Sequence, residues 1–166
     1  MPTIVREYKP TDAQAVDDIA RAAFAEYESC FEEWSSVYEE WSCMSLLDEQ
    51  GSILVAVDGE CIAGAVCLLD SNTPKHKCFE PEWAVLRSLV VSPKVRGRGT
   101  GARLTRACIT RAMDEGYQTI GLLTSPIMEA AVKLYVKLGF VLHRDYGVRN
   151  GIRWVVYTKE LDDQTA

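Results

Sequence analysis

The sequence of 166 residues predicts one α/β domain, spanning residues 1–166 with a core at about 3–161, built on a mixed sheet. Short apolar runs bounded by turn residues are typical of buried strands, and apolar residues three and four positions apart are typical of helices. Both kinds of segment alternate along the chain without a repeat or a linker. A chain of this length can bury roughly two-thirds of its unfolded surface.

The first half of the chain predicts a strand, helices and a hairpin. Asp12 is placed to cap a first helix, and helical composition continues to about residue 47. Asp58 and Gly59 form a two-residue hairpin signal between two apolar runs. Strands are expected at residues 3–8, 53–57 and 61–69.

The second half predicts strands that alternate with two further helices. An apolar run at residues 83–91 leads into a glycine-rich turn, and the following helix of about residues 100–115 stops at Gly116. The last helix is expected to begin at Ser125 and Pro126, with Ile127 facing inward. The remaining strands are expected at residues 117–125, 141–146 and 152–161.

Composition excludes several classes of protein. No run approaches the roughly 20 apolar residues that span a bilayer, and the first residues lack the pattern of a signal peptide, so a cytoplasmic location without membrane association is expected. The six cysteines form no CxxC pair and are expected to be reduced. His76 and Cys78 alone make a poor metal site, because zinc requires three or four protein ligands, so no metal is expected.

The net charge of −6 is unevenly distributed. Residues 1–60 hold 14 acidic and 3 basic residues, whereas residues 61–166 hold 10 acidic and 15 basic residues. Six basic residues between 94 and 111 have no acid among them. A nucleic-acid protein is usually basic overall, so this local charge favours a small anionic ligand and no nucleic-acid partner.

The turn at residues 95–104 combines three glycines with three arginines between a strand and a helix. The unpaired N–H groups at such a helix start can face a phosphate, with Arg96 and Arg98 adding charge; the alternative is a tight connection with solvated arginines. No P-loop pattern is present. Gly97 to Ala102 matches the dinucleotide fingerprint, but the next strand ends without the acid that such proteins place near the ribose.

The same turn reads Arg96-x-x-Gly99-x-Gly101, and a helix containing Tyr135 before Leu138, Gly139 and Phe140 follows it. Together these motifs resemble the GCN5-related N-acetyltransferases (GNAT) over nearly the whole element order. The resemblance implies a central mixed, mostly antiparallel sheet flanked by helices, and acetyl-CoA as cosubstrate. It implies cofactor contacts from the strand before the turn and from the turn itself, at Leu89, Val90, Val91, Arg96, Gly97, Arg98, Gly99, Thr100 and Gly101.

The resemblance also implies direct acetyl transfer to an amine, with Tyr135 matching the family's general acid. The general base is expected at Glu82, which alternatively lies at a solvated strand entrance. Val85 occupies the position at which some members carry a base, and Met128 replaces a frequent asparagine. These departures favour the alternative of a non-catalytic acyl-CoA-binding or sensing domain. Arg87 either faces the cleft or pairs with a neighbouring acid.

The acceptor is expected to be a primary amine of a small molecule or of a protein, and the chain a monomer or homodimer. Six glutamates would attract a cationic amine, although charges on helices are usually solvated. Trp34, Tyr38 and Trp41 either line a pocket or, as we expect, pack in the core. The six glutamates are Glu26, Glu28, Glu32, Glu33, Glu39 and Glu40.

Overall fold

The computed structural model describes residues 2–162. Within them, seven strands form one sheet in the order β1-β2-β3-β4-β5-β7-β6. All neighbouring strands are antiparallel except β4 and β5, which confirms the mixed, mostly antiparallel sheet. The strands are Ile4–Glu7 (β1), Gly51–Asp58 (β2), Cys61–Leu69 (β3), Ala84–Val91 (β4), Thr119–Thr124 (β5), Val141–Arg149 (β6) and Ile152–Glu160 (β7).

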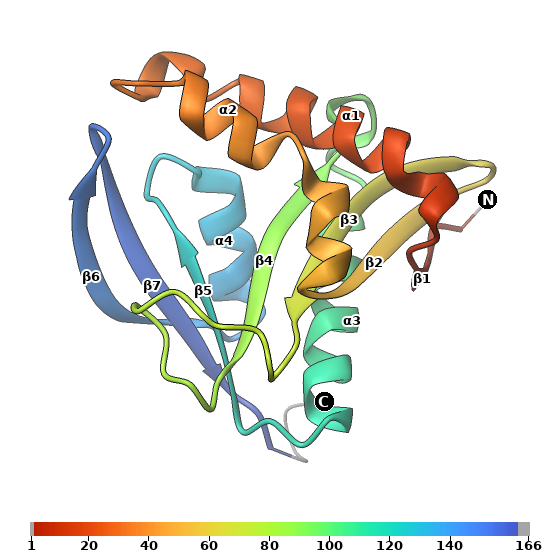
Figure 1. Cartoon of the computed structure of the whole chain (residues 1–166). Helices are drawn as coiled ribbons and strands as arrows, with labels where there is room; N and C mark the ends of the chain where they lie inside the picture. The colour runs from red at the N-terminus through yellow and green to blue at the C-terminus, as the bar shows by residue number, and fades with distance from the viewer. Residues whose placement is uncertain (1, 163–166) are drawn as a thin grey trace.

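Helices cover both faces of this sheet (Figure 1). Alternate residues of a strand point to opposite faces, so the apolar strands supply two cores. One core joins α1 to the face that carries Ile53 and Val85, and the other joins α3 and α4 to the face that carries Leu86. The α-helices are Ala13–Ala25 (α1), Ser35–Trp41 (α2), Thr100–Asp114 (α3) and Glu129–Lys137 (α4), and short 3-10 turns are Pro10–Asp12 (η1), Glu28–Cys30 (η2), Met44–Glu49 (η3) and Pro93–Val95 (η4).

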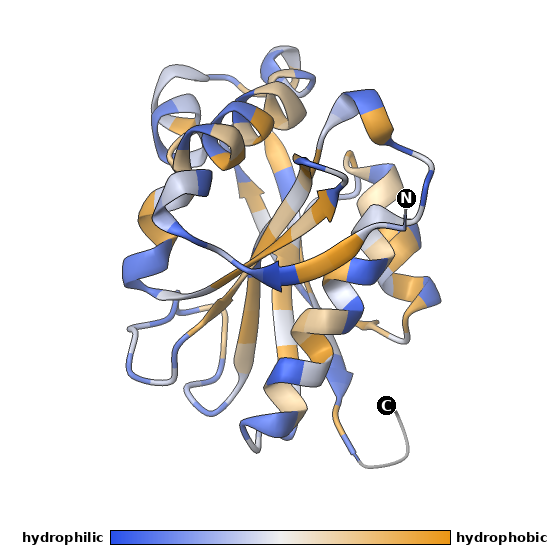
Figure 2. Ribbon diagram, turned by 90° about the vertical axis from the view of Figure 1, so that its right-hand side faces the viewer, coloured by the Kyte–Doolittle hydropathy of each residue, from blue (hydrophilic) through white to orange (hydrophobic). Residues whose placement is uncertain are grey.

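The distribution of hydropathy agrees with this layering. Hydrophobic segments run along the central strands, whereas hydrophilic segments gather in loops and at helix ends (Figure 2). The helices α1, α3 and α4 each bury apolar residues against the sheet, as expected for amphipathic helices.

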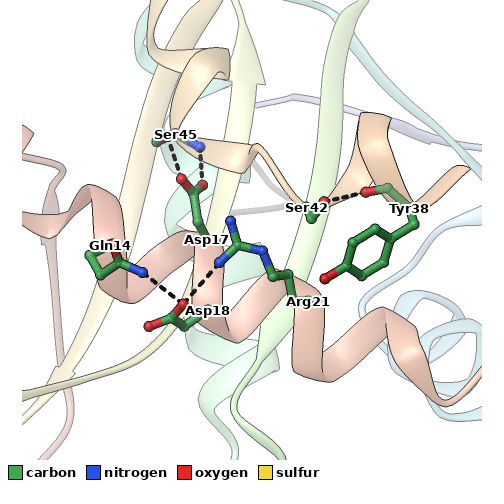
Figure 3. Close-up of polar contacts among 7 residues, drawn as sticks. All are labelled: Gln14, Asp17, Asp18, Arg21, Tyr38, Ser42 and Ser45. Atoms are coloured by element: carbon green, nitrogen blue, oxygen red, sulfur yellow. Dashed lines mark hydrogen bonds and ion pairs between the residues drawn. The ribbon is translucent and has the colours of Figure 1, made fainter. Parts of the chain in front are cut away.

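Polar contacts hold α1 against the segment that follows α2. The Asp17 carboxylate accepts hydrogen bonds from the Ser45 backbone N–H at 2.7 Å and from its hydroxyl at 2.8 Å (Figure 3). The Ser42 hydroxyl donates to the Tyr38 carbonyl oxygen at the end of α2. The Asp17–Ser45 contacts hold the segment after α2 to α1, and α1 and α2 together form a wall of the site described below.

Two local expectations were wrong. The last helix begins at Glu129, after a turn in which the Met128 N–H donates to the Ser125 carbonyl oxygen, and Ile127 is 38% exposed instead of facing inward. Asp12 does stand at the start of α1, but its carboxylate does not cap that helix. It accepts from both terminal nitrogens of Arg6, at 2.8 and 3.0 Å, and from the Lys9 N–H at 2.8 Å.

Candidate functional site

The sheet opens between its two parallel strands. β4 and β5 pair only at Ala84 and Val85 and then diverge (Figure 1). The β3–β4 ladder shifts register in the β4 segment that contains Ser88, whose φ of 59° marks a β-bulge. A cavity of about 610 Å³ occupies this gap, lined by β4, β5, α4, the α1–α2 wall and β6–β7. We call it the central cavity.

The free edge of β4 offers backbone groups to this gap. The Ser92 N–H donates to the Ala63 carbonyl oxygen of β3 at 2.8 Å. Because residues along an antiparallel strand alternate between its two edges, Val90 also turns its polar backbone toward β3. Leu89 and Val91 turn theirs the other way, where β5 no longer pairs. An extended ligand can add to this edge as another strand does.

The glycine turn brings the start of α3 next to this edge. Gly97 and Gly99 have φ of 81° and 80°, the left-handed region that disfavours residues with a Cβ. The Arg103 N–H already bonds to the Gly99 carbonyl oxygen, so the earlier N–H groups of the helix, beginning with Thr100, lack intrahelical acceptors. These N–H groups and the helix dipole make the turn suited to an anion.

The two arginines of the turn are engaged by acids. Arg96 lies 2.7 Å from Glu26, which follows α1, and Arg98 lies 3.8 Å from Asp58 in the β2–β3 hairpin. All four side chains are at least 32% exposed, so these ion pairs are weak. An anion bound at the turn would therefore lie near both arginines and would compete for them with the carboxylates of Glu26 and Asp58.

Tyr135 reaches the central cavity from α4. Its side chain is only 5% exposed, and its ring packs edge-on against Phe140 with ring centroids 5.6 Å apart. No hydrogen bond of its hydroxyl to another residue occurs within residues 2–162. Burial, with smaller contributions from Cys108 and Tyr27, raises the pKa of Tyr135 above its ordinary value. The phenol therefore stays protonated at neutral pH and faces a space in which a reactant can lie.

The structure does not bring Glu82 to Tyr135. Glu82 is exposed just before β4 and lines a different hollow, together with Glu115 and Tyr117. Val85 and Met128, the two departures from the family pattern, do line the central cavity. The base role of Glu82 therefore stays a prediction without support from this geometry.

One of the six glutamates considered in the sequence lies in the cavity instead, although no catalytic role was predicted for it. Glu40 of α2 lines it and accepts a hydrogen bond from Arg87 of β4 at 3.1 Å. Arg87 therefore fulfils both alternatives, because it faces the cavity and pairs with an acid. An arginine within an apolar strand was the sequence signal for a charged contact at this place. The sequence did not identify its partner, because Glu40 lies 47 residues away.

Aromatic rings form one end of the cavity. Trp41 packs against Phe24, Phe31 and Trp154 with ring centroids 4.6 to 6.1 Å apart, and all four side chains line the cavity. None of Trp34, Tyr38 and Trp41 is buried, so their expected place in the core was wrong. The helix α2 contributes no buried residue, and its aromatic face closes over the cavity.

Other classes of site find no support in residues 2–162. No group of three His, Cys, Asp or Glu side chains converges there as a metal site requires. No helix in that range is both long and apolar enough to cross a bilayer. Cys67 and Cys78 are buried, and burial raises the pKa of these thiols to about 12 and about 11, which disfavours a reactive thiolate.

Comparison with known proteins identifies relatives of this chain. N-acetyltransferase 8 of Mus musculus is 40% identical over 97 residues, which are 58% of this chain and 41% of that protein. The chain spans less than half the length of the curated relatives it matches.

Two solved structures share the fold at low identity. The PaiA N-acetyltransferase of Thermoplasma acidophilum, in complex with coenzyme A, is 16% identical, with a TM-score of 0.74 over 96% of this chain and 99% of that chain. The yncA protein of Salmonella typhimurium, solved with its cofactor acetyl-CoA, is 18% identical with a TM-score of 0.70 over 99% of this chain and 96% of that chain.

The sequence model of the acetyltransferase (GNAT) family matches residues 14–140, a range that runs from α1 past the glycine turn to Phe140. This match includes both motifs and most of the central cavity. The chain therefore belongs to the GNAT acetyltransferase family.

Proposed function

We propose that this protein is an acetyl-CoA-dependent N-acetyltransferase that moves the acetyl group directly to a primary amine. One observation carries the proposal: the free β4 edge at Leu89 and the Tyr135 side chain border one cavity beside an anion-suited glycine turn. A ligand with a phosphate end and an extended arm suits this arrangement, and coenzyme A has both.

The cofactor would use backbone more than side chains. The backbone of Leu89 and Val91 would pair with the pantetheine arm, next to Val90, which pairs with β3. The pyrophosphate would lie on the turn, with Arg96 and Arg98 beside it. The residues proposed for this part of the site are Arg96, Gly97, Arg98, Gly99, Thr100 and Gly101.

Transfer requires two proton movements. The neutral amine attacks the thioester carbon, the carbon–sulfur bond breaks, and the departing sulfur takes a proton from Tyr135. The nitrogen releases a proton to water, and the Tyr135 phenolate regains one from water. A thiol has a pKa near 8.5 in water, below that of a phenol. In the cavity, however, the burial that raises the pKa of Tyr135 also disfavours a thiolate, so the two pKa values move in the same direction.

The experiment is an acetyl-CoA assay with a panel of primary amines that follows release of free CoA. Tyr135→Phe should lower kcat roughly 10²-fold or more, because general acid catalysis typically contributes that much, with little change in CoA affinity. Because the pKa of Tyr135 is raised, its neutral form persists at alkaline pH, and the wild-type rate should show no loss from its ionisation up to about pH 10. Equal kcat in the variant would remove Tyr135 as the acid.

A second candidate function is a non-catalytic acyl-CoA sensor. Val85 is 1% exposed and lines the cavity at the position where a base was considered, and it cannot accept a proton. Tight CoA binding without transfer to any amine of the panel would favour this alternative.

That residues 1–166 form a single domain also stays a prediction. Residues 1 and 163–166 of that range lie outside the described residues. The cytoplasmic location and the monomer or homodimer stay predictions as well.

A further inference from the structure

The pair of Arg87 and Glu40 places opposite charges side by side on the wall of the central cavity. Arg87 comes from β4 below the α1–α2 wall, and Glu40 comes from α2. Their side chains are 37% and 61% exposed, so both remain accessible to a ligand. The inference drawn from this pair rests on the proposed function and concerns the acceptor.

Arg87 has unused capacity for an anion. Only one of its terminal nitrogens bonds to Glu40, at 3.1 Å. A guanidinium carries five N–H donors in a planar fork that matches a carboxylate. A carboxylate can therefore bind Arg87 while Glu40 remains in place, and the free oxygen of Glu40 can then accept from an ammonium group.

The remaining charges of the cavity favour a ligand that carries an anionic group over a ligand with two cationic groups. Lys77 and Arg149 also line it, and neither forms an ion pair with an acid within residues 2–162. The Arg149 guanidinium lies over the Tyr146 ring, 5.4 Å from its centroid. Of the six glutamates considered in the sequence, only Glu40 lines the cavity, so three cations face one carboxylate. A polyamine would meet net positive charge there.

The aromatic end of the cavity fits an apolar group next to these charges. Phe31, Trp41 and Trp154 enclose it together with Phe24, and their ring faces and edges can contact a flat or branched apolar side chain. The volume of about 610 Å³ lies in the range of small-molecule sites. A ligand that satisfies both ends carries an amine, a carboxylate and an apolar body.

We propose that the acceptor is a free α-amino acid with an apolar, aromatic side chain. Its carboxylate binds Arg87, its amino group faces Glu40, and its side chain lies among Phe31, Trp41 and Trp154. Glu40 is then positioned to accept the proton that the ammonium loses before attack on the thioester, so the nitrogen gains its lone pair and the carboxylate becomes a carboxylic acid that releases the proton to water.

The test compares L-phenylalanine, phenethylamine and putrescine as acceptors in the acetyl-CoA assay. Phenethylamine keeps the amine and ring but lacks the carboxylate, and putrescine is a small diamine. We expect kcat/KM for L-phenylalanine to exceed that for phenethylamine by roughly tenfold or more, because a charge-assisted hydrogen bond contributes about that much. A preference for phenethylamine or putrescine would overturn the proposal.

Variants test whether Arg87 causes the preference for L-phenylalanine over phenethylamine. Arg87→Met should lower the ratio of kcat/KM for L-phenylalanine to kcat/KM for phenethylamine to about one, and Arg87→Lys should restore part of this ratio. The control is Arg21→Met, which removes an arginine whose exposed ion pair with Asp18 lies on α1 outside the cavity lining (Figure 3). An unchanged preference in Arg87→Met refutes the assignment.

Binding of L-phenylalanine to the CoA-saturated protein is measured by calorimetry in parallel. Binding that depends on Arg87 without any acetyl transfer would refute the proposed function and support an amino-acid-binding site at Arg87. Transfer to other amines, with no binding of L-phenylalanine, would support the proposed function and refute the amino acid as acceptor. Circular dichroism of each variant confirms that the variant is folded.

Discussion

Replacing Gly99 by alanine should separate the stability of the fold from its affinity for coenzyme A. Gly99 has φ of 80° and ψ of 9°, and a Cβ built there has no heavy atom within 4 Å. The substitution therefore causes backbone strain without a clash. The left-handed region costs an L-residue roughly 1–2 kcal/mol, and the stiffer unfolded chain offsets up to about 1 kcal/mol of it. A net loss of ~1 kcal/mol lowers Tm by about 2–4 °C in a chain of this size.

The matched control is Gly59→Ala in the β2–β3 hairpin. Gly59 has φ of 66°, and a methyl group on its Cα would likewise have no heavy atom within 4 Å, so a similar loss of Tm is expected. Only Gly99 stands at the proposed anion site, where the added methyl group would occupy space that a phosphate needs. Calorimetry should give a CoA dissociation constant raised roughly tenfold for Gly99→Ala and unchanged for Gly59→Ala, because one lost charge-assisted contact is worth about that factor.

Two results would refute this reasoning. Equal CoA affinity in the two variants would mean that the turn does not bind the pyrophosphate. If Gly99→Ala lowered Tm several times as much as Gly59→Ala, the substitution at Gly99 would destabilise the fold by more than backbone strain. Because a similar backbone strain is expected at both glycines, the CoA affinities test pyrophosphate binding at the turn, and the Tm values test the strain.

Three further predictions concern charged groups. Glu26→Gln should strengthen CoA binding about two- to threefold by calorimetry, because it frees Arg96 from an exposed ion pair; weaker binding would contradict the competition. Glu82→Gln should keep the wild-type rate and pH profile, because Glu82 does not line the central cavity, and a lost basic limb would restore its predicted base role. Arg6 holds the pKa of Asp12 below its ordinary value, so this contact stabilises the fold above that value and is lost as pH falls through the lowered pKa. Asp12→Asn should cost about 1–3 kcal/mol in urea unfolding at pH 7, and the difference from wild type should shrink as the pH falls below the ordinary pKa of an aspartate; a difference that does not change with pH would refute it.

Local patterns account for what the sequence predicted well. Strand periodicity and turn residues are set by neighbours in the chain, so the hairpin at Gly59 and the helix that ends before Gly116 were predicted close to their observed bounds. The candidate site residues Gly99 and Tyr135 were identified by the same kind of local pattern, and their roles stay predictions. Each is recognised by spacing along the chain, and spacing does not depend on how distant elements pack.

Long-range packing accounts for what the sequence did not predict. Glu40 resembles its glutamate neighbours on α2, and only the position of α2 above β4 brings it to Arg87. Trp41 was expected in the core because large aromatic side chains are usually buried. It lines the cavity because β4 and β5 separate and leave no sheet surface for α2 to cover, and pairing between strands cannot be read from the periodicity of either strand.

The charge asymmetry of the chain links these observations. Four ion pairs within residues 2–162 join an acid from the first 60 residues to an arginine from the remainder, and two of those arginines, Arg96 and Arg98, belong to the glycine turn. Much of the positive charge that suggested an anionic ligand is thus paired with acids of the protein itself. Exposed pairs of this kind are worth at most about 1 kcal/mol each, whereas bidentate contacts of arginine with phosphate are stronger. Glu26 and Asp58 can therefore hold Arg96 and Arg98 near the turn at little cost and release them when a pyrophosphate binds.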